Sequence, residues 1–185
     1  MDKERVKKLV RELIIEIGED PTREGLKDTP RRIADAYSEI FQGYDSDSEL
    51  SVQFSEDSET VVAKNIQFYS MCEHHMLPFY GKIHIAYSPN GRVFGISKLV
   101  RLVEKYSKRL QIQERVTKNI ADELYSQGVK GVAVFADAEH LCMKMRGVRN
   151  DATLSSSAFR GIYENKEEKE SVLALSRKRS SDSSF

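Results

Sequence analysis

The chain has 185 residues, 39% of them hydrophobic and 31% charged, which is enough to bury the core of one domain of ordinary size. Its 29 basic residues balance its 29 acidic residues, and this balance argues against a dedicated nucleic-acid-binding protein, since such proteins usually carry a basic excess. A small anionic ligand is still compatible with this charge, because a local cluster of arginines is enough to bind one.

No apolar run approaches the roughly 20 residues that a membrane span needs. The N-terminal sequence is charged and lacks the apolar core of a secretory signal. The two cysteines, Cys72 and Cys142, are too few for a disulfide framework. We therefore expect a soluble cytoplasmic protein without nucleic-acid or membrane partners.

Two helices are predicted at the N-terminus. In the first, apolar residues recur at helical spacing over 6–17, and Gly18 ends the helix. The second is expected to have Thr29 as its N-cap and Pro30 at its first helical position, and to end at Gly43.

The middle of the chain has a strand-forming pattern. Residues 45–59 are acidic and rich in serine, which predicts a surface loop with at most a short strand. Strands are expected at 60–70, 80–87 and 92–96. The last two are predicted to form a hairpin, because the sequence Pro-Asn-Gly at 89–91 favours a turn.

The second half alternates helices and strands. One helix is expected to begin at Ser97 as its N-cap and to run to about Arg109, and another to run from Gln113 to a stop at Gly128. The remaining elements are a buried strand at 131–138, a strand at 152–162 and a helix at 164–176.

This order of elements predicts an α+β fold, with an antiparallel sheet covered by helices on one face. We expect an N-terminal helical segment over 1–44 and a catalytic domain over 45–176. Residues 177–185 are polar and small, which is typical of a disordered tail.

Cysteine and histidine residues form two short motifs. The run Cys-Glu-His-His at 72–75 contains the C-x2-H spacing of a zinc half-site, and His140 and Cys142 follow a predicted strand further along. Inert packing of two buried cysteines is the alternative. Three ligands would make a catalytic site and four a structural one, and the count of residues allows either.

Three further features could bind a ligand. Arg32, Lys98, Arg101, Arg146 and Arg149 form a basic set, in which each residue alone is most simply a surface charge. Lys98 and Arg101 open a helix, whose free N–H groups favour an anion. The first turn of the next helix carries an acidic residue, which suits the helix dipole but could also accept hydrogen bonds from an amidine-like edge such as that of guanine. A lone histidine at position 84 is interpreted as structural.

Four stretches resemble, in order and spacing, the motifs of the GTP cyclohydrolase I family. They are GEDPTREGLKDTPRRIADAY (18–37), SMCEHHMLPFYGKIHIAY (70–87), GISKLVRLVEKYSKRLQIQERVTKNIADEL (95–124) and HLCMKMRGV (140–148). The resemblance implies the tunnelling fold, in which antiparallel sheets of several subunits close into a barrel. It also implies a homodecamer with active sites between subunits, and hydrolysis of GTP to 7,8-dihydroneopterin triphosphate and formate, the entry to folate and tetrahydrobiopterin synthesis.

Residue by residue, the resemblance implies a role for each matching position. Zn²⁺ would be held by Cys72, His75 and Cys142, which leaves one position for water. His74 and His140 match catalytic histidines, with His140 expected to protonate N7 while the activated water attacks C8. Glu114 matches the residue that holds the guanine edge, with Gln113 beside it. The triphosphate and ribose contacts match Ser97, Lys98, Arg101 and Arg146, and Arg32 matches a further phosphate contact.

Two alternatives and some departures from the family pattern remain. Leu110 stands where family members often carry proline.

One alternative is a non-enzymatic zinc protein that binds a nucleotide or a protein partner, with His74 or His140 as fourth ligand. The other is a tunnelling-fold relative, such as a nitrile reductase, which needs a free cysteine nucleophile and a nicotinamide cofactor. Ligand softness favours Zn²⁺ over Fe²⁺ without deciding between them.

Overall fold

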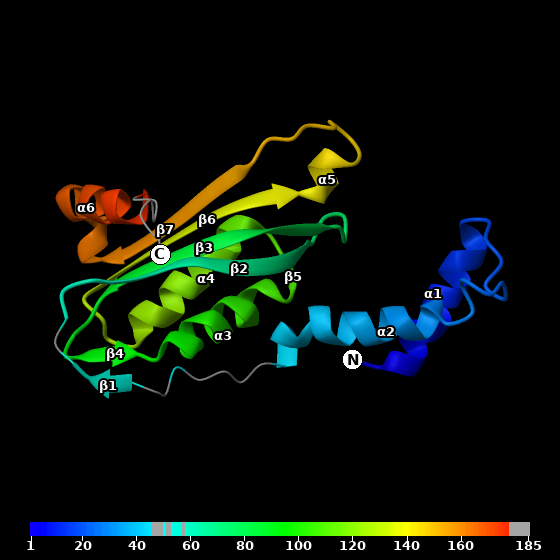
Figure 1. Ribbon diagram of the computed structural model, residues 1–185, viewed down its shortest axis with the longest axis horizontal. Coiled ribbons are helices and arrows are strands. Elements are labelled where there is room, and N and C mark those ends of the chain that lie inside the picture. The colour runs from blue at the N-terminus through cyan, green and yellow to red at the C-terminus, as the bar shows by residue number, and fades with distance from the viewer. Residues whose placement is uncertain (46–49, 51–52, 57, 178–185) are drawn as a thin grey trace, which may run out of the picture.

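The computed structural model describes residues 1–45, 50, 53–56 and 58–177 (Figure 1). The helices are α1 (Lys3–Glu16), α2 (Thr29–Ile40), α3 (Ile96–Ser107), α4 (Gln113–Ser126), α5 (Leu141–Lys144) and α6 (Lys166–Arg177), with 3-10 turns η1 (Gln42–Asp45) and η2 (Ile162–Glu164). The strands are β1 (Gln53–Ser55), β2 (Val61–Cys72), β3 (Pro78–Ser88), β4 (Arg92–Phe94), β5 (Leu110–Gln111), β6 (Gly131–His140) and β7 (Leu154–Gly161). Every helix in these residues is too short or too polar to span a membrane.

The first two helices form an arm that projects away from the sheet (Figure 1). They pack mainly on each other, with Val10 and Ile14 of α1 and Ala34 of α2 buried between them. Both helices were predicted, but the expected N-cap of the second was wrong by one residue. Asp28 is the N-cap, and Thr29 is already the first helical residue.

The main sheet has the strand order β5-β2-β3-β6-β7. Its pairs are antiparallel, except that the short β5 runs parallel to the end of β2. Alternate residues of the central strands, such as Ile83 and Ile85 of β3 and Val134 of β6, are fully buried in the core. Amphipathic α3 and α4 cover this face, as the sequence predicts.

A smaller apolar cluster lies on the opposite face of the sheet. Ala86 and Ala133, which alternate with the residues of the main core, pack there with Tyr163 and Val172. The last helix, α6, thus covers one end of the second face, which the expectation of a single covered face did not include. It extends to Arg177, and residues 178–185 of the expected tail lie outside the described part of the chain.

The predicted hairpin between the strands at 80–87 and 92–96 is wrong. Strand β4 forms a separate two-stranded sheet with β1, in which Gln53 pairs with Phe94. The reason is that both edges of β3 are already occupied, by β2 on one side and β6 on the other. The turn is present, with Gly91 at a φ of 74°, but it directs the chain away from the sheet.

The start of α3 also differs from the prediction. Gly95 is its N-cap and Ile96 its first residue, so Ser97 lies inside the first turn and its side chain forms no cap. Helix α4 begins at Gln113 as predicted, and Gly128 follows its end with a φ of 83°. The antiparallel α3 and α4 therefore connect the two ends of the sheet.

These two ends carry different residues. At the end that we call the cysteine end, β2 finishes with Cys72, β3 begins at Pro78, β6 finishes with His140 and α4 begins with Gln113. At the opposite end, β3 finishes at Ser88 opposite Gly131, and the chain passes through β4 into the start of α3. We call this the α3-start end (Figure 1).

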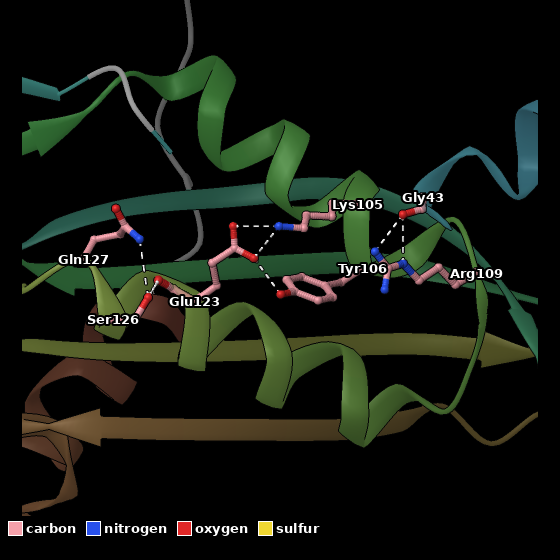
Figure 2. A network of polar contacts seen from close by, with 7 residues as sticks. All are labelled: Gly43, Lys105, Tyr106, Arg109, Glu123, Ser126 and Gln127. Atoms are coloured by element: carbon pink, nitrogen blue, oxygen red, sulfur yellow. Dashed lines mark hydrogen bonds and ion pairs between the residues drawn. The ribbon is translucent and has the colours of Figure 1, made fainter. Parts of the chain in front are cut away.

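A polar network fixes α3, α4 and the arm to one another (Figure 2). Glu123 of α4 accepts hydrogen bonds from Lys105 at 2.7 Å and from Tyr106 at 2.6 Å. Arg109 donates twice to the carbonyl oxygen of Gly43, at 3.0 and 2.7 Å. Residue 43 must be glycine, because a Cβ there would lie 2.6 Å from the backbone oxygen of Lys105.

Candidate metal centre and active site

Three side chains from two distant segments meet at the cysteine end. The ligand atoms of Cys72, His75 and Cys142 all lie within 4.8 Å of one another. Cys72 ends β2, and His75 lies in the tight turn that follows, in which the N–H of Met76 donates to the oxygen of Cys72 at 2.8 Å. Cys142 arrives from β6 through the start of α5.

The donor set of this cluster fits a divalent metal ion. Two thiols and an imidazole are the ligands that zinc prefers. Burial raises the pKa of the Cys142 thiol and the neighbouring Cys72 thiol raises it further, whereas Arg146 acts in the opposite direction. Two facing thiols in a half-buried site thus disfavour ionisation unless a cation compensates, and a bound metal would supply that charge.

The other two histidines lie near the cluster without joining it. Nδ1 of His74 is 3.9 Å from the sulfur of Cys72, at the edge of a contact with sulfur. His140 turns its Nε2 toward Gln113 instead, at 2.9 Å. Within the described residues the cluster therefore offers three side chains that could hold a metal ion, which is the number of protein ligands in a catalytic zinc site.

His140 is held between the sheet and the start of α4. Its ring stacks on Phe79, its partner in the β3–β6 register, with centroids 4.7 Å apart and an angle of 3° between the planes. Burial lowers the pKa of His140, and the Glu114 carboxylate opposes that shift. Glu114, which is exposed in the first turn of α4, is therefore close enough to His140 for its charge to affect the pKa of that ring.

The expectation that Gln113 takes part in substrate binding beside Glu114 stays a prediction, and its side chain makes other contacts in the structure. Its side chain is fully buried, and its amide nitrogen donates to the oxygens of Ala136 and Leu154, both at 2.9 Å. The amide oxygen faces His140. Every polar atom of this side chain is thus used within the protein.

An ion pair beside the cluster was missed by the sequence analysis. Arg115 donates to both carboxylate oxygens of Glu73, at 2.5 and 3.2 Å, and lowers the pKa of Glu73. The backbone N–H of Glu73 donates to the oxygen of Gln111 at 3.0 Å. These contacts attach the turn that carries His75 to the start of α4. The available signal was that Glu73 and Arg115 carry opposite charges and each stand next to a predicted site residue.

The expected phosphate contacts are divided among three places. Arg146 lies at the cysteine end, close enough to Cys142 to affect its thiol. Ser97, Lys98 and Arg101 lie in the first half of α3, at the α3-start end. Arg32 lies in the arm, 3.7 Å from Asp28, with 67% of its side chain exposed. One chain therefore does not bring these residues together.

His84 lies away from the cluster, within β3. It is half-buried, its Nδ1 is buried without a hydrogen bond, and burial lowers its pKa. The interpretation of His84 as a structural histidine stays a prediction.

Comparisons with known proteins find relatives that match most of the chain. The family model described as GTP cyclohydrolase I matches residues 6–177. A GTP cyclohydrolase 1 of Hyperthermus butylicus is 53% identical over 89% of this chain and 85% of its own. The GTP cyclohydrolase 1 of Clostridium kluyveri is 52% identical over 90% of this chain and 92% of its own. That of Aquifex aeolicus is 49% identical over 88% of this chain and 90% of its own.

Proposed function

Since this chain belongs to the GTP cyclohydrolase I family, we propose that it opens the purine ring of GTP at its own cysteine end, with zinc as the metal, and holds the triphosphate with residues of a neighbouring copy. The family's fold is the tunnelling fold. Its reaction hydrolyses GTP to 7,8-dihydroneopterin triphosphate and formate in pterin biosynthesis.

The observation that carries the proposal is the three-ligand cluster with two histidines beside it. Cys72, His75 and Cys142 would hold Zn²⁺, and their softness favours zinc over Fe²⁺. When bound in such an open site, zinc supplies an activated water near neutral pH. His74 and His140 stay free for proton transfer, because neither belongs to the cluster.

Side chains of this chain have separate tasks in the proposed reaction. His140 gives a proton to N7 of guanine while C8 is attacked, which neutralises the charge that builds on that nitrogen. The Glu114 carboxylate accepts two hydrogen bonds from the guanine edge and fixes the orientation of the base. His74 moves protons during the later rearrangement of the ribose. Arg146 binds phosphate beside the reacting base.

The triphosphate site needs a second copy of the chain. Ser97, Lys98 and Arg101 lie at the α3-start end, a full sheet length from the proposed zinc ligands. Strand β7 forms one edge of the sheet, and β2 is covered on its outer side only where β5 pairs with it. In the homodecamer proposed for this protein, the contacts between copies would have to bring the cysteine end of one chain to the α3-start end of another.

We propose that the protein acts in the cytoplasm, because of the state of its two cysteines. Cys72 and Cys142 are both free thiols, and the proposed zinc site needs them reduced. A reducing cytoplasm meets this requirement.

The test is to incubate the purified protein with GTP and to measure formate, the fluorescent pterin obtained after oxidation, and bound zinc. We expect both products and about one zinc per chain. Zinc without turnover would overturn the proposal in favour of a structural metal protein. Products formed at an unchanged rate after removal of all metal would overturn the role of zinc.

A further inference from the structure

The side-chain amide of Gln113 has a single orientation that satisfies its neighbours. Its Nε2 lies 2.9 Å from the carbonyl oxygens of Ala136 and Leu154, which can only accept hydrogen bonds. Its Oε1 therefore faces the third neighbour, Nε2 of His140, at 2.9 Å. The reversed amide would place an oxygen against two carbonyl oxygens and leave these buried groups unpaired, which is unfavourable.

This orientation determines which nitrogen of His140 carries a hydrogen. An amide oxygen only accepts, so Nε2 of His140 must be the donor in both the neutral and the charged ring. The neutral ring is then the Nε2–H tautomer, and Nδ1 is the nitrogen with a free lone pair. Among the residues that the structure describes, no group hydrogen-bonds to Nδ1.

Phe79 fixes the plane of the same ring. The two rings are parallel to within 3° at a centroid distance of 4.7 Å, and Phe79 is fully buried. A half-turn of the imidazole about its Cβ–Cγ bond would keep this stacking, but it would place a carbon against the oxygen of Gln113. Stacking and the hydrogen bond together leave one ring position.

We propose that Gln113 is a positioning residue, which holds His140 with Nε2 protonated so that Nδ1 alone exchanges a proton with the substrate. The identity of that substrate rests on the proposed function. The forward step begins from the charged ring, in which both nitrogens carry a hydrogen. The Nδ1–H bond breaks and an N7–H bond forms, while one electron pair of the C8–N7 double bond moves to N7. The oxygen that adds to C8 is that of hydroxide, formed when the attacking water loses a proton to solvent. The ring that remains is the neutral Nε2–H tautomer that Gln113 stabilises.

The kinetic test uses Gln113→Met, which keeps the length of the side chain and removes the amide. We expect kcat for formate release to fall by about 10- to 100-fold, as for a misplaced catalytic group. KM for GTP should change by less than about threefold, because the guanine and phosphate contacts remain. A rise in KM with kcat unchanged would show a substrate contact instead and would overturn the inference.

The matched control is Gln111→Met. Gln111 is also buried and also donates from its amide to a backbone oxygen, that of Tyr106 at 3.0 Å. Its amide oxygen accepts a long hydrogen bond from Arg115 at 3.4 Å, and no hydrogen bond among the described residues joins it to His140. Both variants should lose a similar few degrees of melting temperature. A general loss of packing would affect the two equally, whereas loss of positioning alters His140 only in Gln113→Met.

The direct readout is solid-state ¹⁵N NMR of histidine-labelled protein. The chain has four histidines, and His140→Ala identifies the signal of interest. Above the usual imidazole pKa of about 6.5, wild-type His140 should be entirely Nε2–H. Gln113→Met should show both tautomers, and Gln111→Met the wild-type signal.

The outcomes separate this inference from the proposed function. A wild-type His140 with its hydrogen on Nδ1 would overturn the inference even if Gln113→Met did not fold. An unchanged tautomer in folded Gln113→Met would do the same. Wild-type protein that shows the expected tautomer but releases no formate from GTP would instead contradict the proposed function.

Discussion

The two ends of the sheet are built in different ways. At the cysteine end, residues from four elements converge within one chain, and the Glu73–Arg115 ion pair and the Gln113 amide hold them in place. At the α3-start end, Arg101 is exposed and Lys98 is half-buried in the first half of α3, and no ion pair involves either of them among the described residues.

In the proposed function, this difference separates the groups that open the purine ring from the cationic side chains that bind the triphosphate. The groups proposed to react must keep fixed distances, since small displacements reduce the rate strongly, and the hydrogen bonds that hold them come from a single chain. Cationic side chains that hold a triphosphate tolerate more freedom, and they can be supplied by a neighbouring copy. The following changes should affect the two ends differently.

The largest effect is expected for Cys142→Ser, which removes a ligand of the proposed zinc site. The variant should lose bound zinc, and its formation of pterin should fall by at least about 1,000-fold, because activated water near neutral pH depends on the metal. Elemental analysis and fluorescence measure the two effects. Met143→Leu, one residue further in α5 and outside the cluster, is the control that should keep zinc. Full activity of the serine variant would exclude Cys142 as a ligand.

Mixed assemblies should show whether the two ends belong to one site. A His140→Ala chain lacks the proposed acid, and a Lys98→Ala/Arg101→Ala chain lacks the proposed phosphate contacts, so each alone should be nearly inactive. After equal co-expression, about a quarter of the sites should combine two intact ends from neighbouring copies. The rate of pterin formation measures the recovery. A mixture no more active than its two parents would place both ends of a site in the same chain.

Local patterns explain why the cysteine end was largely predictable. The spacing of Cys72 and His75 is that of a single turn, and Cys142 follows a strand whose buried pattern is clear, so two half-sites could be expected from the residues. The choice of these three side chains over His74 and His140 came only from the resemblance to the family. The role of Gln113 could not, because it depends on the position of two carbonyl oxygens, those of Ala136 and Leu154, that only the register of β6 and β7 determines.

Errors in the rest of the fold have a common cause. The turn at Gly91 is a strong local signal for a hairpin, but β3 had no free edge, and this depends on β6, which follows about 40 residues later. Likewise, Ser97 has the chemistry of an N-cap, yet the helix begins two residues earlier than predicted, because Gly95 takes the N-cap position. Local propensity identified the elements and missed their partners.

A tenfold effect is expected for the arginine at the cysteine end. Arg146→Ala should raise KM for GTP by about tenfold and leave kcat nearly unchanged, because it removes one charged hydrogen bond to phosphate, worth about 1.4 kcal/mol. Steady-state fluorescence gives both constants. Arg149→Ala changes an exposed arginine three residues further along and should keep the wild-type KM. Equal effects of the two variants would indicate general electrostatic attraction rather than a contact by Arg146.

The smallest effect is expected between the two ends, where α3 packs on α4. Tyr106 donates to Glu123 at 2.6 Å, and Lys105 is paired with the same carboxylate (Figure 2). Tyr106→Phe removes that hydrogen bond and should lower the free energy of unfolding by about 1 kcal/mol near pH 8. Zinc content and KM for GTP should not change, because neither end is touched.

The pH dependence of this small loss distinguishes the hydrogen bond from packing. Burial first, and then the hydrogen bond to Glu123, raise the pKa of Tyr106 above its usual range, while Arg109 acts in the opposite direction and Asp122 in the same one. A raised pKa in the folded state gives stability that is complete below the unfolded pKa of about 10 and is lost as pH rises above it. The difference in unfolding free energy between wild type and Tyr106→Phe, measured by urea denaturation, should therefore be constant up to about pH 9 and shrink above pH 10. A difference that stayed constant through this range would mean that the hydroxyl contributes only by filling space, and that the Glu123 network does not hold α3 against α4.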